Sequence, residues 1–324
     1  MLNSTVRLAL GAGVLVISAG AQATVAYQIT TIDAPGQNPA HLQTFLYGIN
    51  NAGDRVGGYG YVKPIHGYVD VGGAYSHVDP PGTCIDSGTP CYNVALAINN
   101  NGVIAGHYST DYGQVHGFVR DAGSNYTLFD VPFVNAVGTE AHGINDAGVI
   151  VGEYIDAATT SAHSFVRAAA GGITEFKNPT ASETVARGIS NGGIIFGDFV
   201  VQSGNNQGVH GFYYVNGVFQ QVDRPYANGT IVFGGNDSGA LVGMSFDDYG
   251  NGHAFQRDSF GLYTELDITG ADYAQATGIN DAGQVVGFYR DAKGAHGFLA
   301  SPVPEPATWL LMGMGLMVLV PRRR

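Results

Sequence analysis

The chain has 324 residues, of which 45% are hydrophobic and 49 are glycine, and its formal net charge is −12. A polypeptide this acidic repels the phosphates of nucleic acids and anionic lipids, so DNA, RNA and the membrane surface are poor partners. Length alone would suggest about two domains, but a regular internal repeat can build one large domain from small units.

The N-terminus has the order of a secretory signal peptide. Arg7 is followed by the apolar run LALGAGVLVISAG and then by Ala21-Gln22-Ala23. A charged residue, an apolar run and a small-residue end predict cleavage by signal peptidase between Ala23 and Thr24. A buried first helix is the alternative, but it fits less well because the strand-like YQITTID follows at once. We therefore assign residues 1–23 to a signal peptide.

Six copies of one short motif divide most of the remaining chain. GINDAG occurs twice without change, and weaker copies lie between and before the two identical ones. The copies start 44 to 49 residues apart, which indicates an array of six units. They read GINNAG from Gly48, AINNNG from Ala97, GINDAG from Gly143, GISNGG from Gly188, GGNDSG from Gly234 and GINDAG from Gly278.

Each unit has the pattern of four short strands. In the third copy, Asn145 and Gly148 suit a type I turn that ends in a glycine with positive φ. This turn joins the strands AHGIN and VIVGEY, and HSFVR and ITEFKNP follow as third and fourth strands. No segment before the C-terminal tail sustains a helical period. Four antiparallel strands repeated six times predict an all-β, six-bladed β-propeller over residues 24–301.

The first strand after the signal peptide supplies what the last unit lacks. The sixth copy ends after HGFLASP without a fourth strand, whereas AYQITTIDAP near the N-terminus resembles the fourth strands AYSHVDPP and NYTLFDVP. An N-terminal strand that completes the last blade would close the ring and remove an exposed sheet edge. An open solenoid is the alternative arrangement.

Connection lengths distinguish the two faces of the predicted disc. The turns between first and second strands and between third and fourth strands hardly vary, whereas the other two connections vary in length. Variable loops on a rigid scaffold often bind ligands, so we place a carbohydrate or protein ligand on that face, near the N-terminal half. Drift in loops without a function would produce the same variation. The longest of these loops contains Cys84 and Cys91, which predict a disulfide in an exported protein.

Repeated histidines and acidic residues have structural explanations. One histidine opens each third strand, which lies too far from the axis for the six imidazoles to converge on one metal ion. We therefore expect each imidazole to bond within its own blade, and we expect no metal or other cofactor. The aspartates of the Asp-x-Pro positions resemble loop caps, and Lys177 breaks their pattern. The aspartates are Asp33, Asp79, Asp130, Asp223 and Asp267.

A few polar residues that do not repeat stand where the first and second strands approach the axis. Glu140, His142, His107, Glu153 and Asp198 could form an acid/base cluster in a central funnel. The lining of a hydrated channel is the alternative role, and it is favoured because nothing in the sequence fixes their separation. No G-x-S-x-G elbow, phosphate-binding loop or H-E-x-x-H motif is present in the sequence.

The C-terminal tail combines a short motif, an apolar run and a basic end. About fourteen apolar residues would cover roughly 21 Å as a helix, less than the roughly 30 Å of a bilayer core. The tail over residues 302–324 resembles the PEP-CTERM sorting signal of Gram-negative bacteria. That resemblance implies transient membrane contact, removal by exosortase, and delivery to the outer surface or to exopolysaccharide. The matching residues are Val303, Pro304, Glu305, Pro306, Arg322, Arg323 and Arg324.

The third strands also resemble the HAF repeats of extracellular proteins, which are named for a His-Ala-Phe sequence. This chain has His253-Ala254-Phe255, and HGY, HGF or HSF at the other copies. The family implies an extracellular location without an agreed activity. Together these features predict an exported binding or structural protein at the cell surface or in exopolysaccharide. A polysaccharide-directed hydrolase or lyase with its site in the central funnel is the alternative.

Overall fold

The computed structural model describes residues 25–36, 42–60, 65–83, 92–109, 114–204 and 207–303. Within these ranges every regular element is a β-strand, as predicted. The signal peptide, both cysteines and the chain from Pro304 onward lie outside the described residues, and so the disulfide stays a prediction. In the described part of the chain, no helix is long and apolar enough to cross a bilayer.

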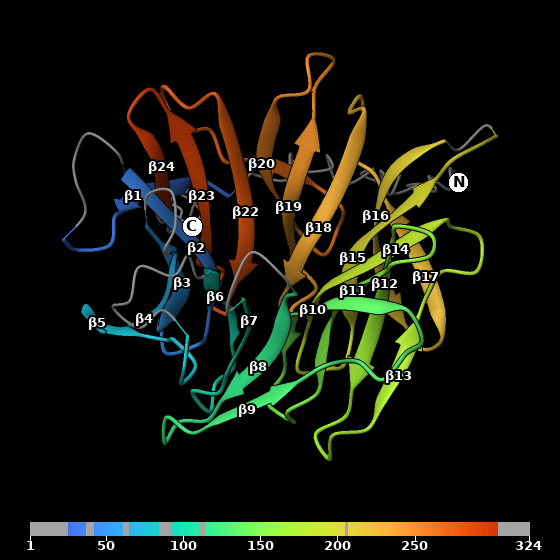
Figure 1. Ribbon diagram of the computed structural model, residues 1–324. Helices are drawn as coiled ribbons and strands as arrows, with labels where there is room; N and C mark the ends of the chain where they lie inside the picture. Colours follow the sequence, from blue (N-terminus) through green and yellow to red (C-terminus); the bar gives the residue numbers. More distant parts are fainter. Residues whose placement is uncertain are drawn as a thin grey trace, which may run out of the picture.

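The strands form four hydrogen-bonded sheets, none of which closes on itself. Two sheets have four antiparallel strands, and two have eight. Each larger sheet consists of two four-stranded antiparallel groups, joined by parallel pairing over only one or two residue pairs. Six four-stranded groups therefore lie around a common centre, and Figure 1 shows them in chain order. We number them groups 1 to 6.

Each group corresponds to one copy of the repeated motif. Group 1 consists of β2 (Leu42–Ile49), β3 (Arg55–Tyr59), β4 (His66–Val71) and β5 (Ala74–His77). Group 2 consists of β6 (Tyr92–Ile98), β7 (Ile104–Ser109), β8 (His116–Arg120) and β9 (Tyr126–Phe129). Group 3 consists of β10 (Ala136–Ile144), β11 (Ile150–Asp156), β12 (Ser161–Arg167) and β13 (Ile173–Phe176). Group 4 consists of β14 (Glu183–Ile189), β15 (Ile195–Val201), β16 (Gly208–Val215) and β17 (Val218–Val222). Group 5 consists of β18 (Gly229–Gly235), β19 (Leu241–Phe246), β20 (Gly252–Arg257) and β21 (Tyr263–Glu265). Group 6 consists of β22 (Tyr273–Ile279), β23 (Val285–Asp291) and β24 (Gly294–Pro302), together with β1 (Tyr27–Ile32).

The N-terminal strand β1 is the outer strand of group 6. It runs antiparallel to β24, with Tyr27 opposite Pro302 and Ile32 opposite Gly297. The pairing continues beyond the strand, because the Val303 amide donates to the Ala26 carbonyl at 2.8 Å. This is the strand pairing that the sequence predicts for the N-terminus.

The motif residues form tight hairpins between the first and second strands. The Gly148 amide donates to the Asn145 carbonyl at 3.0 Å, and Gly148 has a φ of 76°. A non-glycine residue is strained in that region, so glycine ends the turn in every copy. The predicted turn is therefore confirmed, and the Asn145 side chain strengthens it by accepting a hydrogen bond from the Val149 amide at 3.0 Å.

Hydrogen bonds join each hairpin to the hairpin of the next group. The side-chain amide of the motif asparagine donates to the main chain of the next copy. The main-chain amide one residue later, or two residues later in the fourth copy, donates to a side chain there. Both kinds of bond also run from group 6 to group 1. The asparagine amides donate from Asn50 to Asn99, Asn99 to Asn145, Asn145 to Ser190, Asn236 to Asn280 and Asn280 to Asn50.

Ser190 is the exception in this series, because its side chain offers no amide to the carbonyl of Asn236. We expect Ser190→Asn to raise the free energy of unfolding by about 0.5–1.5 kcal/mol, the usual contribution of one buried hydrogen bond. Asn145→Ser should lower it by a similar amount. Urea unfolding of both variants measures this, with Ser190→Ala as the control that adds no donor. Unchanged stability in both variants would contradict the role of the asparagine.

The core lies between the groups. Six clusters of buried side chains each combine residues of two neighbouring groups. The last of them packs Leu46 and Tyr68 of group 1 against Val286 of group 6. The aromatic residue of each third strand is at most 1% exposed, so it contributes a large buried apolar surface to its group. These residues are Tyr68, Phe118, Phe165, Phe212, Phe255 and Phe298.

Candidate functional site

A cavity of about 370 Å³ lies at the common centre of the six groups. All six first strands contribute side chains to its wall, because these strands are the innermost of each group. Group 3 contributes Glu140, His142 and Glu153, and group 4 contributes Arg187. Group 5, in contrast, contributes only apolar side chains, which are Ile231, Phe233 and Met244. Tyr47 and Tyr92 add aromatic rings to the wall.

Strand alternation brings the predicted cluster together. Successive side chains of a strand point to opposite faces, so Glu140 and His142 share the cavity face of β10, while Ala141 between them is fully buried. Glu153 lies directly opposite Glu140 in the register of β10 and β11. His107 reaches the same cavity from β7 in group 2. Four of the five predicted residues therefore line one cavity.

The contacts within this cluster converge on Glu140. Its Oε2 atom lies 3.3 Å from His142 Nε2 and 3.5 Å from His107 Nδ1. His142 Nε2 is also 3.6 Å from Glu153 Oε1. Both imidazoles are at least nine-tenths buried as side chains. The sequence indicated these residue types near the axis but not their separation, and the separation is what the structure adds.

The fifth predicted residue, Asp198, acts through Arg187. The Arg187 Nε atom donates to Asp198 Oδ1 at 2.5 Å, and Arg187 lines the cavity. Burial would lower the pKa of Arg187, but the charges of Asp198 and Glu153 outweigh burial and raise it. The cavity therefore contains a fixed guanidinium cation.

Charge and burial oppose each other at Glu140. Burial would raise the pKa of this carboxyl group, but His107, a hydrogen bond from His142 and the charge of Arg187 outweigh burial and lower the pKa to about 2. Burial lowers the pKa of His107, an effect that Glu140 partly opposes. At neutral pH the cavity holds an ionised Glu140 beside a neutral His107.

Arg187, Tyr47 and Tyr92 are site residues that the sequence analysis missed. Arg187 and Tyr47 occupy the position before the first motif residue, which also holds His142 in the third copy. Alignment of this column across the six copies would have identified them. Tyr92 begins its strand, as Tyr273 does in the sixth copy. It is recognised only because its ring stacks on His107, with centroids 5.4 Å apart.

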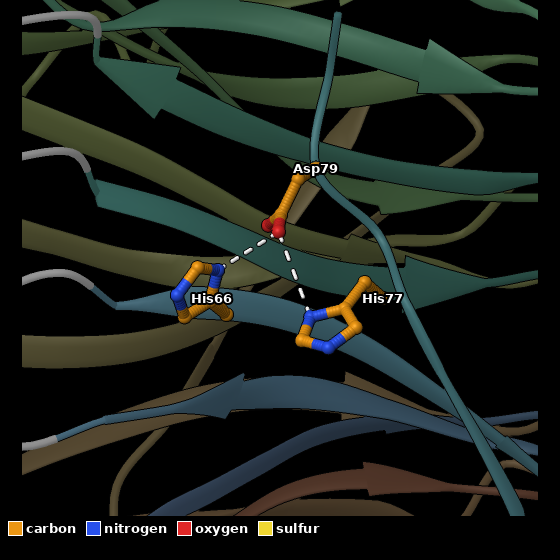
Figure 2. Close-up of side chains that lie close together, drawn as sticks. All are labelled: His66, His77 and Asp79. Carbon is orange, nitrogen blue, oxygen red and sulfur yellow. Dashed lines mark hydrogen bonds and ion pairs between the residues drawn. The ribbon is translucent and has the colours of Figure 1, made fainter. Parts of the chain in front are cut away.

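The third-strand histidines lie away from this cavity and pair within their own groups, by a hydrogen bond in five groups and at 3.7 Å in group 3. Each Nδ1 atom faces a carboxylate at the end of the fourth strand. Figure 2 shows the pair in group 1, where His66 Nδ1 lies 2.8 Å from Asp79 Oδ2 and His77 is nearby. The other pairs are His116–Asp130, His163–Glu175, His210–Asp223, His253–Glu265 and His296–Asp33.

These pairs correct the expected role of the Asp-x-Pro acids. We expected loop caps, but Asp33, Asp79, Asp130 and Asp223 are imidazole partners. In groups 3 and 5 a glutamate two residues before Lys177 or Asp267 takes this role instead. Group 6 takes its carboxylate from the N-terminal segment, so that His296 and Asp33 lie 3.1 Å apart although 263 residues separate them.

The PEP-CTERM protein-sorting motif matches residues 302–324 of the chain. This motif marks a protein that is exported and is sorted by exosortase to the cell envelope or surface of Gram-negative bacteria. The match covers only the tail, and the resemblance to HAF repeats stays a prediction. No curated protein matches the sequence.

Several solved structures resemble the chain at low identity. The Aleuria aurantia lectin in complex with Fucα1-6GlcNAc has a TM-score of 0.49 and 12% identity, over 84% of this chain and all of that one. AofleA from Arthrobotrys oligospora has a TM-score of 0.48 and 12% identity, over 82% and 83%. TolB from Acinetobacter baumannii has a TM-score of 0.48 and 12% identity over 80% of this chain, which spans only 63% of TolB. These likenesses say nothing of what this chain binds.

Proposed function

We propose that the chain is an exported binding protein of the cell surface or exopolysaccharide, and that it binds a carbohydrate in its central cavity. In this proposal residues 1–23 are a signal peptide, residues 24–301 form a closed six-bladed β-propeller, and residues 302–324 are the sorting tail. Signal peptidase and exosortase are its processing partners.

Three observations support a closed ring of six. The hairpin hydrogen bonds pass from group to group and from Asn280 back to Asn50 at 3.1 Å. The hydrophobic clusters follow the same circular order. Strand β1 pairs with β24, so that both ends of the chain contribute to group 6. A ring of this kind leaves a funnel at its axis, where the first strands present their side chains.

The composition of the cavity wall carries the proposal of a carbohydrate ligand. Sugars combine apolar C–H faces with hydroxyl groups, and their sites combine aromatic rings with a few fixed polar groups. Here Tyr92 and Phe233 supply rings, and Glu140, Arg187 and Gln275 supply acceptors and donors.

A hydrolase or lyase in the same funnel is the second candidate. Glu140 and Glu153 are paired carboxylates, as glycosidases require, and their oxygen atoms lie within 4.8 Å of each other. However, glycoside hydrolysis needs one protonated carboxylic acid, and the pKa of Glu140 is lowered to about 2. Glu140 would therefore act as a base or nucleophile, and another group would have to supply the proton.

We expect the purified chain to bind glycans on an array and to bind the exopolysaccharide of its host. Tyr92→Ala should weaken binding by roughly tenfold or more, because one aromatic stacking platform is lost. Tyr226→Ala is the matched control, since Tyr226 is fully exposed and lies beside a different groove. Loss of binding in the control but not in Tyr92→Ala would place the ligand outside the cavity.

The same material tests for catalysis. The double variant Glu140→Gln, His142→Gln is compared with the unaltered chain for turnover of the exopolysaccharide. If neither protein releases sugar, the hydrolase or lyase is eliminated. Turnover that disappears in the double variant would overturn the assignment as a binding protein.

A further inference from the structure

Three side chains of the cavity have the arrangement of metal ligands. Glu140, His142 and Glu153 each offer one ligand atom, and these atoms all lie within 4.8 Å of one another. All three are held by paired strands, β10 and β11, and not by flexible loops. Metal sites need ligands that the surrounding fold holds in place, and a pair of adjacent strands provides this.

The distances within the cluster also match the spacing of ligands around a shared cation. The Glu140–His142 and His142–Glu153 contacts are 3.3 and 3.6 Å, longer than the usual 2.9–3.0 Å of an N–H···O bond. Two ligands that bind zinc tetrahedrally at about 2.0–2.1 Å are about 3.3–3.4 Å apart. The side chains are therefore already spaced as neighbours in a coordination shell.

A buried polar atom beside the cluster lacks a partner. His107 is 5% exposed, and its Nδ1 atom makes no hydrogen bond within the described residues. It lines the same cavity and lies 3.5 Å from the Glu140 oxygen that faces His142. A buried nitrogen without a partner costs about 1–3 kcal/mol, and so this position points to a ligand that supplies one.

The charge of the cavity favours a divalent cation. Glu140, Glu153 and Arg187 are its charged lining residues apart from the imidazoles, and Arg187 is paired with Asp198. With Asp198 included, one guanidinium faces three carboxylates, so two of the negative charges remain unbalanced. One divalent ion would balance them. Imidazole together with carboxylate suits zinc and its first-row neighbours, whereas calcium prefers six to eight oxygen ligands.

The second group of this kind, in Figure 2, is explained without a metal ion. His66 and Asp79 form a normal hydrogen bond of 2.8 Å, and equivalent pairs occur in other groups. His77 is 62% exposed as a side chain and lies 3.6 Å from the same carboxylate. This group therefore serves as an internal control.

We propose that the central cavity binds one first-row divalent metal ion, best Zn²⁺, through Glu140, His142 and Glu153. Three protein ligands leave a coordination position open toward the cavity, where His107 or a bound ligand can take it, as in zinc sites with an exchangeable position. The proposal does not rest on carbohydrate binding, because the ion alone is the probe.

The test uses the purified full chain after treatment with EDTA and gel filtration. Isothermal titration with Zn²⁺ should give one ion per chain, and the addition of Zn²⁺ should raise the melting temperature. Co²⁺ should give visible absorption bands of a site with nitrogen and oxygen ligands. Absence of stoichiometric binding by both titration and metal analysis would overturn the proposal.

Variants locate the ion. His142→Gln and Glu153→Gln should each weaken Zn²⁺ binding by about 100-fold or more, since even residues behind the ligands contribute about 10–100-fold. His66→Gln and His163→Gln are controls that should bind as the unaltered chain does. Circular dichroism checks that every variant is folded. If one variant does not fold, the Co²⁺ spectrum of the unaltered chain still tests the ligand set. Binding that survives both cavity variants, or that His66→Gln abolishes, contradicts the proposed site.

Discussion

A chain that begins at residue 37, and so lacks β1, is expected to lose at least about 3 kcal/mol of unfolding free energy and to aggregate. Without β1 the edge of β24 is exposed, and an unpaired edge strand invites pairing with other chains. The partly buried Tyr27 and Ile29 also leave the cluster between groups 5 and 6, and each costs a part of the about 1.5–3 kcal/mol of a fully buried side chain. Urea unfolding and light scattering measure both effects.

A permuted chain shows whether the lost stability comes from the absence of β1 or from the new N-terminus at residue 37. The Val303 amide already donates to the Ala26 carbonyl, so a turn of two to four residues can join residue 303 to residues 25–36 moved to the C-terminal end. This permuted chain, which again begins at residue 37, should regain the stability of the natural order. Its failure to recover, or full stability of the truncated chain, would show that β1 does not complete group 6.

The local structure was predictable because turn chemistry is short-ranged. A glycine three residues after an asparagine specifies the hairpin wherever it occurs, and all six motif turns have this glycine at a φ of 74–86°. Strand length was less predictable. We expected the first strand of the third unit to start near Ala141, but β10 starts at Ala136, because the Thr139 amide bonds to Val115 in group 2. A contact between units leaves no local signal.

The candidate site was predictable only in part, for the same reason. Glu140 and His142 stood out because most units carry apolar residues at those positions. Arg187 did not, since a single arginine is usually a surface residue, and its burial depends on Asp198 from the next strand. Four of the six carboxylates that pair with the histidines were visible as Asp-x-Pro aspartates. Their role was not, because an aspartate that caps a loop and one that binds an imidazole have the same sequence pattern until the strands are placed side by side.

A glycine of each second strand lies too close to the first strand to carry a side chain. A Cβ atom built at Gly57 would lie 2.0 Å from the Phe45 carbonyl oxygen and 2.8 Å from the ring of Tyr68. The equivalent glycines would meet a first-strand carbonyl at 1.9–2.1 Å, so all six units need a residue without a side chain there. They are Gly57, Gly106, Gly152, Gly197, Gly243 and Gly287.

We expect Gly57→Ala to lower the free energy of unfolding by about 3 kcal/mol, since relief of the contact requires β2 and β3 to separate or Tyr68 to leave the core. Gly172→Ala is the matched control, because a Cβ atom there would meet nothing within 4 Å and its φ is negative or extended. That change should be neutral, or stabilise by up to about 1 kcal/mol by restricting the unfolded chain.

Addition of Tyr68→Leu to Gly57→Ala tests which contact dominates. Removal of the ring relieves the 2.8 Å contact but leaves the carbonyl oxygen in place, so the double variant should recover little of the loss. Full recovery would assign the glycine to the aromatic residue of the third strand. Stability of Gly57→Ala equal to that of the control would mean that β2 and β3 are not paired in this register, and the central cavity would lose its frame, because the same pairing in group 3 places Glu140 opposite Glu153.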